Sequence, residues 1–225
     1  MVVSPRVGVL ALQGGVREHL EFLEKVGAQA VRVRKVGELS GLDGLIIPGG
    51  ESTTISKLLV ALDLYQPIDE LIKEGLPTWG TCAGMILLAD HVEGAVEGQV
   101  SFKAIDATVK RNAFGSQTQS HEELLKIKGL DAPVHGVFIR APIVVQVGPE
   151  VEVLGRSTRR REDGEEPIVA IAQGSVLATS FHPELSDDTA MHRFFLDNFV
   201  RNSPVTNSSV TNSPVTQGPA AKSQA

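Results

Sequence analysis

This sequence of 225 residues has one cysteine, few aromatic residues and no long hydrophobic run. A single cysteine cannot form an internal disulfide, which favours a reducing, cytosolic location. No apolar stretch reaches the roughly 18 to 20 residues that span a bilayer, so we predict no membrane partner. The residues after Met1 also lack the charged, apolar and cleavage regions of a secretory signal peptide.

Basic residues are too few for a surface that binds polyanions. The chain carries 21 Lys and Arg against 27 Asp and Glu, a formal net charge of -6. This balance excludes nucleic acid as the expected partner. Hydrophobic residues make up 42% and aromatic residues 4% of the chain. Such a composition is typical of an aliphatic globular protein whose core consists of Val, Leu, Ile and Ala.

The first half of the sequence alternates short apolar runs with helical patterns. The run 7–12 is nearly continuous, as in a strand covered on both faces, and Val16, Leu20 and Leu23 recur at helical spacing after it. Further segments follow in the same order: strands at 30–34 and 42–47, then a helix that Ser52 or Thr53 would cap. This order predicts a parallel sheet with helices on both faces.

The second half is richer in strand patterns. Strands are expected at 134–139, 143–147, 151–155, 168–173 and 176–181. The last three, separated by turn residues, predict a small antiparallel meander. A final helix should begin near Asp187 or Asp188 and place Met191, Phe194, Phe195 and Phe199 on one face, against the sheet.

The end of the chain differs in composition from the rest. Three degenerate copies of Asn-Ser-Pro-Val-Thr follow Arg201, and a segment rich in Gly, Pro, Ala and Ser comes after them. Such a sequence cannot bury enough apolar surface to order itself. We therefore predict one domain over residues 1–201 and a disordered low-complexity tail over 202–225.

The only cysteine stands at the centre of Gly80-Thr81-Cys82-Ala83-Gly84. An apolar strand is expected at 76–79 and a helix at 85–89, so the motif predicts a nucleophile elbow. Its glycines permit the sharp turn, and the helix N-terminus favours the reactive thiolate. A lone cysteine is more often a small buried hydrophobic residue. Glycines at this spacing on both sides favour the nucleophile instead.

A cysteine nucleophile needs a base, and His182 is the preferred candidate among six histidines. It follows an apolar strand, and the carboxyl ends of strands are where α/β sheets bind ligands. Glu184 is placed to orient the imidazole. His91 and His192 are interpreted as surface or capping residues. With no second cysteine and no His-x-x-x-His spacing, the sequence predicts neither a metal nor a cofactor.

Acyl chemistry also needs donors for a developing oxyanion. The amide of Ala83 follows the nucleophile directly, which is the usual place for one donor. The loop Pro48-Gly49-Gly50-Glu51-Ser52 is a candidate for the second, through the Gly50 amide. The loop by itself is equally compatible with an ordinary turn between a strand and a helix.

A set of motifs in order resembles the class I glutamine amidotransferases and, among them, the glutaminase subunits of pyridoxal 5'-phosphate synthase. The motifs lie between residue 7 and about residue 200, and they are more specific together than any one alone. They are Gly8-Val9-Leu10-Ala11-Leu12-Gln13-Gly14, Glu18-His19, Ile46-Ile47-Pro48-Gly49-Gly50-Glu51-Ser52-Thr53-Thr54, Gly80-Thr81-Cys82-Ala83-Gly84, Arg111-Asn112-x-Phe114-Gly115, Phe138-Ile139-Arg140-Ala141-Pro142 and Ser180-Phe181-His182-Pro183-Glu184-Leu185.

The resemblance implies a flavodoxin-like three-layer α/β fold and glutamine hydrolysis by a Cys82, His182 and Glu184 triad. It implies a partner as well, a synthase subunit that receives the ammonia to make pyridoxal 5'-phosphate. The glutamine contacts that it implies are Gly50, Glu51, Ser52, Arg111, Ile139 and Arg140. His121, Ser116 and the segment 100–107 depart from the family pattern and bear on glutamine binding or partner contact.

Two other functions remain open from the sequence. One is a glutaminase of the same class that serves purine or histidine biosynthesis. The other is a stress-related hydrolase or chaperone of the same superfamily, which needs no synthase partner. The combination of His182-Pro183-Glu184 with the Gly49-Gly50 loop argues against the second.

Overall fold

Strands and helices alternate from Arg6 to Leu88, as the sequence pattern predicts. The computed structural model describes residues 4–111, 120–160 and 164–203. Up to Leu88 the elements are β1 (Arg6–Leu10), α1 (Val16–Lys25), β2 (Gln29–Val33), η1 (Val36–Leu39), β3 (Gly44–Ile47), α2 (Ser52–Ala61), α3 (Tyr65–Lys73), β4 (Thr78–Thr81) and α4 (Ala83–Leu88).

Strands predominate after Leu88. The elements there are β5 (Ala89–Glu93), β6 (Ile105–Lys110), β7 (His121–Leu125), β8 (Val134–Phe138), β9 (Ile143–Val147), β10 (Glu152–Arg156), β11 (Ile168–Gln173), β12 (Val176–Thr179), η3 (Pro183–Leu185), α5 (Ala190–Phe195) and η4 (Leu196–Val200). The bounds of β9 and β11 match the predicted ranges. No sequence pattern predicted β5, β6 or β7, in which polar and charged side chains are interspersed with apolar ones.

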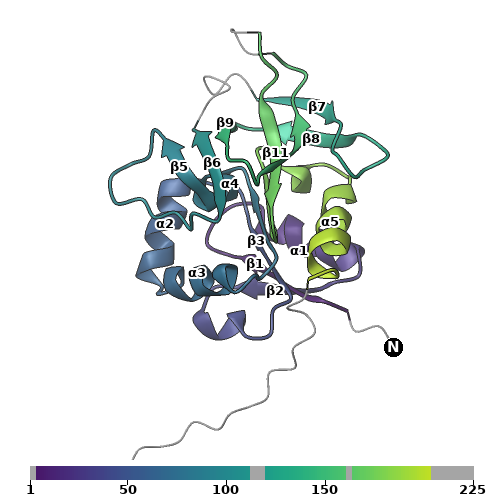
Figure 1. Cartoon of the computed structure of the whole chain (residues 1–225). Helices are drawn as coiled ribbons and strands as arrows, with labels where there is room; N and C mark the ends of the chain where they lie inside the picture. The colour runs from purple at the N-terminus through teal and green to yellow at the C-terminus, as the bar shows by residue number, and fades with distance from the viewer. Residues whose placement is uncertain (1–3, 112–119, 161–163, 204–225) are drawn as a thin grey trace, which may run out of the picture.

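The large sheet is parallel at one side and largely antiparallel at the other (Figure 1). Within the described residues its order is β2-β1-β3-β4-β12-β11-β9-β6-β5, with β10 paired to β11. Strands β2, β1, β3, β4 and β12 are mutually parallel. Strands β10, β11 and β12 form the predicted antiparallel meander. Because β12 also pairs with β4, the meander extends the parallel sheet instead of standing apart from it.

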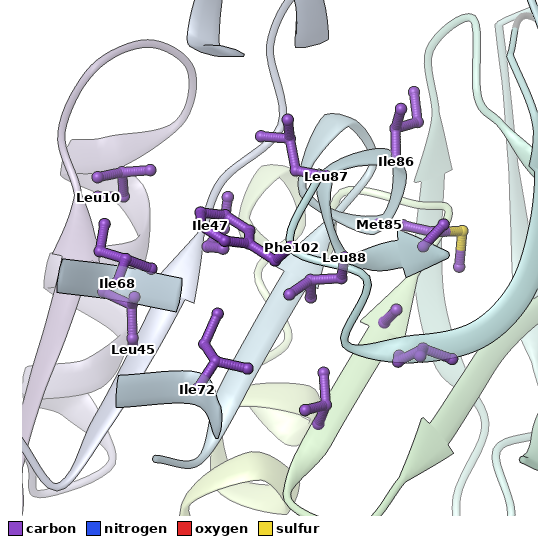
Figure 2. Packing of buried hydrophobic residues seen from close by; sticks show 14 of the residues in the cluster. Leu10, Leu45, Ile47, Ile68, Ile72, Met85, Ile86, Leu87, Leu88 and Phe102 are labelled. Carbon is purple, nitrogen blue, oxygen red and sulfur yellow. The ribbon is translucent and has the colours of Figure 1, made fainter. Parts of the chain in front are cut away.

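Helices cover both faces of this sheet, which makes three layers. On one face α2, α3 and α4 enclose a cluster that includes Leu45, Ile47 and Leu87 (Figure 2). On the other face α1 and α5 pack over a second cluster that includes Ile46. Successive strand residues point to opposite faces, so the adjacent Ile46 and Ile47 enter different clusters. Each fully buried side chain of this size contributes about 1.5 to 3 kcal/mol. The predicted α/β fold is confirmed.

Helix α3 was missed by the sequence analysis. It contains Pro67, a residue that breaks helices in their interior. Here Pro67 lies in the first turn, where the backbone amides have no intrahelical acceptor to lose. Ile68 and Ile72 then bury one face of the helix.

Two predicted helix caps are wrong by one or two residues. Helix α2 begins at Ser52, and its cap is Glu51, whose carboxylate accepts hydrogen bonds from the amides of Thr53 and Thr54. Helix α5 has Thr189 at its cap position. Asp188 contributes by accepting the Ala190 amide at 2.7 Å. Glu51 thus takes the cap position of α2, where it accepts the second and third amides of the helix as a cap normally does.

Some predictions fall outside the described residues. These are the tail from residue 204 onward, the Asn112-x-Phe114-Gly115 part of one motif and the departure at Ser116. Among the described residues, no helix combines the length and the apolar character needed to cross a bilayer.

Candidate active site

Three predicted site residues, together with Gln13, gather at the carboxyl ends of four neighbouring parallel strands. Gln13 follows β1, Gly50 follows β3, Cys82 follows β4 and His182 follows β12. These strands lie side by side in the order β1-β3-β4-β12. Loops at this edge of a parallel sheet converge, which is why residues distant in sequence meet here.

Cys82 adopts the strained backbone of a nucleophile elbow, with φ 49° and ψ -101°. Neighbouring backbone atoms lie so close to Gly80 and Gly84 that no side chain fits at either position. A Cβ atom on Gly84 would lie 2.1 Å from the carbonyl oxygen of Ile47, and one on Gly80 would lie 2.4 Å from the carbonyl carbon of Gly84. Both distances are far below van der Waals contact, so β3, β4 and α4 approach closely only because these side chains are absent. The predicted elbow is confirmed as geometry.

His182 and Glu184 lie beside the cysteine on the turn that follows β12. Nδ1 of His182 donates to Oε1 of Glu184 at 2.8 Å, and the imidazole also interacts with the side chain of Cys82. The His182 amide donates to the carbonyl of Val137 at 2.8 Å, which ties the turn to β8. His182 and Glu184 are 9% and 2% exposed. The three side chains therefore form a Cys-His-Glu chain that is almost closed to water.

The pKa values of His182 and Glu184 are shifted in directions that favour a charged imidazole beside an ionised carboxylate. Burial opposes the positive charge of His182, but hydrogen bonds with Cys82 and Glu184 outweigh it and raise the pKa of His182 to about 10. Burial likewise opposes ionisation of Glu184, but His19 and His182 together keep the pKa of Glu184 below its ordinary value. A charged imidazole beside a carboxylate is the arrangement that stabilises a thiolate.

Two glycine loops close over the triad. A Cβ atom on Gly49 would lie 2.2 Å from Cε1 of His182, and one on Gly15 would lie 2.8 Å from Cγ of Glu184. The Gly49 amide donates to Oγ1 of Thr81 at 3.0 Å. Oε1 of Gln13 accepts the Glu51 amide at 2.7 Å. Both bonds hold the Gly49-Gly50 loop against the elbow.

A cleft of about 560 Å³ opens above Cys82. Its lining contains the predicted nucleophile, base, oxyanion donors and glutamine contacts, together with three residues that were given no role in the sequence analysis. The lining residues are Gln13, Gly14, Gly50, Glu51, Ser52, Cys82, Ala83, Ile86, Arg111, Ile139, Arg140 and His182. Glu184 lies behind His182 and does not line the cleft.

One end of the cleft is charged. Nη2 of Arg111 lies 3.2 Å from Oε1 of Glu51, and its Nη1 donates to Gln99 at 3.1 Å. Although burial opposes it, the hydrogen bonds from Thr53 and Thr54 lower the pKa of Glu51 to about 2. A fixed cation and a fixed anion in one cleft suit a ligand that carries both an ammonium and a carboxylate group.

His192 corrects one interpretation from the sequence. It was interpreted as a surface or capping residue, but its side chain is 0% exposed and lies 2.8 Å from His19, which is equally buried. The pairing joins α5 to α1 across 173 residues of sequence. No local pattern signals such a contact. His91, by contrast, is exposed as expected.

The profile of the SNO glutamine amidotransferase family matches residues 9–201. This chain belongs to that family. The match covers every residue of the predicted triad and of the cleft lining, and it ends where the low-complexity tail was predicted to begin.

Relatives from three bacteria bear the same name, pyridoxal 5'-phosphate synthase subunit PdxT. That of a Nocardioides species is 52% identical over 197 residues, 88% of this chain and 97% of the relative. That of Acidothermus cellulolyticus is 53% identical over 193 residues, 85% and 92% of the two chains. That of Mycolicibacterium smegmatis is 51% identical over 199 residues, 87% and 100%.

Solved structures give the same fold. A crystal structure described as a glutamine amidotransferase aligns with TM-score 0.76 and 48% identity, covering 85% of this chain and 97% of that one. A putative GMP synthase subunit from Thermoplasma acidophilum aligns with TM-score 0.61 over 89% and 94% of the two chains. Its identity is 18%, so it shows only that the fold is shared.

Proposed function

We propose that this chain hydrolyses L-glutamine to L-glutamate and ammonia and passes the ammonia to a synthase subunit that makes pyridoxal 5'-phosphate. The observation that carries the proposal is that Cys82 and His182 line a charged cleft together, with His182 hydrogen-bonded to the buried Glu184 behind it. The names of the relatives favour this pathway over purine or histidine biosynthesis and over a hydrolase without a partner.

In the proposed reaction the Cys82 thiolate attacks the side-chain amide carbon of glutamine. The C=O π electrons move to the oxygen, and the amides of Gly50 and Ala83 stabilise the resulting oxyanion. His182 gives its proton to the departing nitrogen, so ammonia leaves and a glutamyl thioester remains. Water, deprotonated by the same imidazole, then attacks the thioester and releases glutamate. Glu184 orients the imidazole throughout.

The cleft supports specific roles for the glutamine contacts. We assign the α-carboxylate to Arg111 and the α-ammonium group to the ionised Glu51, because both charged side chains line the cleft. Ser52, Ile139 and Arg140 line the same cleft and complete the set of contacts. Arg140 has φ 47°, a strained conformation for a residue with a side chain. Strain of this kind is concentrated at ligand sites, which supports a role in binding.

Ammonia is a nucleophile only while it is unprotonated, and it would be lost by mixing with water. The proposed reaction therefore requires a docked synthase subunit, and we propose that the active form is a hetero-oligomer. Ile139 and Leu185 are 39% and 47% exposed near the site, as expected for residues that a partner covers. The single cysteine supports a reducing, cytosolic setting for thiol chemistry.

Cys82→Ala in the complex with the synthase tests the proposal. Glutamate release should fall to the rate of the uncatalysed reaction, while synthesis of pyridoxal 5'-phosphate from added ammonium continues. Glutaminase activity that persists in Cys82→Ala would overturn the assignment of the nucleophile. Wild-type protein that releases no glutamate with its synthase present would overturn the function.

A further inference from the structure

Two buried histidines extend the triad but take no part in the proposed reaction. His19 on α1 and His192 on α5 are each 0% exposed. Their rings contact Trp79, and His192 also packs edge-on against Phe22. Histidine loses hydration when it is buried, so two adjacent imidazoles in an aromatic cage are costly unless their nitrogens have partners.

Distances link both histidines to Glu184. Nδ1 of His19 lies 2.8 Å from Nε2 of His192. Nε2 of His19 lies 3.4 Å from Oε2 of Glu184 and 3.5 Å from Oγ1 of Thr81. Oε1 of Glu184 is already bonded to His182, and the buried Oε2 has no hydrogen-bond partner among the described residues, so its contact with His19 at 3.4 Å is electrostatic. His19 is thus the group that faces the outer oxygen of the triad carboxylate.

The groups around His19 decide its protonation. It faces Glu184 and His182 from the turn after β12, His192 from α5 and Glu18 from its own helix. Burial lowers the pKa of His19 and lowers that of His192 well below its ordinary value. Both rings are therefore neutral at neutral pH, and each carries one N–H.

Only one arrangement of those two protons satisfies the surroundings. If each ring carries its proton on Nε2, His192 donates to Nδ1 of His19, and the Nε2–H of His19 lies near both the Thr81 hydroxyl at 3.5 Å and the Glu184 carboxylate at 3.4 Å. The opposite arrangement directs a lone pair of His19 at that carboxylate and leaves a buried N–H at Nδ1 of His192, an atom that makes no hydrogen bond within the described part of the chain. An unpaired buried N–H group costs more free energy than an unpaired buried ring nitrogen that carries only a lone pair. A lone pair of His19 that faced the Glu184 carboxylate would also be repelled by its negative charge.

We propose that His19 is a positioning residue for the triad, whose Nε2–H faces Oε2 of Glu184 and holds the carboxylate in place electrostatically, and that His192 fixes the tautomer required for this contact. Glu184 then presents Oε1 to His182 in one orientation and stays ionised while the imidazole gains and loses its proton. The role of Glu184 in the reaction rests on the proposed function, but its contact with His19 does not.

The test compares His19→Leu, which removes the N–H, with His19→Gln, whose side-chain amide places a donor near the same point. In the complex with its synthase, we expect His19→Leu to lower kcat for glutamine about tenfold or more, the effect of losing a polar contact with a buried charged group. KM should not change, because His19 does not line the cleft. His19→Gln should recover most of the rate.

A second measurement needs neither glutamine nor the synthase. Cys82 is the only cysteine in the chain, so the rate of alkylation by iodoacetamide reports on this thiol alone. Without His19 the carboxylate is no longer held in the orientation that supports the His182 cation, so we expect its thiolate partner to form only at higher pH. The pH midpoint of alkylation should therefore rise in His19→Leu and return toward the wild-type value in His19→Gln.

Phe22→Leu is the matched control, because Phe22 is a buried residue of the same helix that packs on His192 without approaching Glu184. It should leave the alkylation midpoint unchanged.

If His19→Leu does not fold, His192→Phe replaces it, and the midpoint should again rise because His19 can then take the other tautomer. An unchanged midpoint in the folded His19 or His192 variant, or an equal shift in Phe22→Leu, would overturn the proposal. Wild-type protein without glutaminase activity would instead overturn the proposed function, while the alkylation result would still decide the role of His19.

Discussion

Thr81 and Gly49 are joined by a hydrogen bond of 3.0 Å, in which the Gly49 amide donates to the threonine hydroxyl. Thr81 ends strand β4 immediately before the nucleophile, and Gly49 begins the loop that is proposed to stabilise the oxyanion. The bond therefore sets the distance between the two halves of the reaction centre. Both residues are buried, so no water molecule competes for the amide.

Thr81→Val should remove this acceptor while it preserves the shape of the side chain. An unpaired buried amide costs about 1 to 3 kcal/mol, and the loop can regain hydration only by moving away from the elbow. We expect kcat to fall about tenfold or more, as for loss of part of an oxyanion site. Glutamate release in the synthase complex measures the effect. Thr81→Ser keeps the hydroxyl and should retain activity; equal rates in the two variants would contradict the prediction.

Gly84→Ala should destabilise the fold itself. The added Cβ atom would meet the backbone carbonyl of Ile47 at 2.1 Å, and a strand inside the sheet cannot yield as a flexible side chain does. We expect the free energy of unfolding to fall by about 2 kcal/mol or more. Urea unfolding measures it. Gly37→Ala is the control, since no atom lies within 4 Å of a Cβ there. Similar losses in the two variants would show that the close approach is unimportant.

Arg111→Lys should weaken glutamine binding more than turnover. The guanidinium group contacts Glu51 and Gln99 through different nitrogens, and a single ammonium group cannot reproduce that fork. We expect KM for glutamine to rise about tenfold, equivalent to about 1.4 kcal/mol of binding free energy, with a smaller change in kcat. Steady-state kinetics of the complex separate the two constants. Lys110→Gln, at the exposed neighbouring position, should leave KM unchanged; if both variants raise KM alike, Arg111 has no special role.

The buried histidines predict how stability depends on pH. His19 and His192 have lowered pKa values in the folded protein, whereas in the unfolded chain they titrate near 6.5. As the pH falls below that value the unfolded state takes up protons that the folded state cannot. Each histidine then lowers the free energy of unfolding by about 1.4 kcal/mol per pH unit until its folded pKa is reached.

His192→Phe removes one of the two histidines that take up a proton more readily in the unfolded state than in the folded state. The loss of stability between about pH 6.5 and about pH 5.5 should therefore be smaller in this variant than in the wild type, by about 1 kcal/mol. Urea unfolding at the two pH values measures the difference. Phe22→Leu, which changes no titratable group, should follow the wild-type slope, and a His192→Phe slope equal to it would contradict the prediction.

Much of the fold was predictable from short patterns. The ranges of β9 and β11 and the helix that follows β1 agree with apolar periodicity, because burial on one or two faces imposes that periodicity directly. No helix was predicted at α3, a nine-residue segment that contains Pro67 and buries only Ile68, Asp69 and Ile72. The caps of α2 and α5 were misplaced because a side-chain oxygen can reach the same amides from neighbouring positions.

The sequence by itself determined the family and the location of the elbow, since glycines on both sides of Cys82 and the His182-Pro183-Glu184 segment encode local backbone geometry. Only the tertiary structure decided which groups meet behind them: Thr81 with Gly49, and His19 with both Glu184 and His192. These contacts depend on how β4 aligns with β3 and on how α1 and α5 pack over one face of the sheet. That alignment is the sum of many weak apolar contacts over the whole core, and no short stretch of sequence contains it.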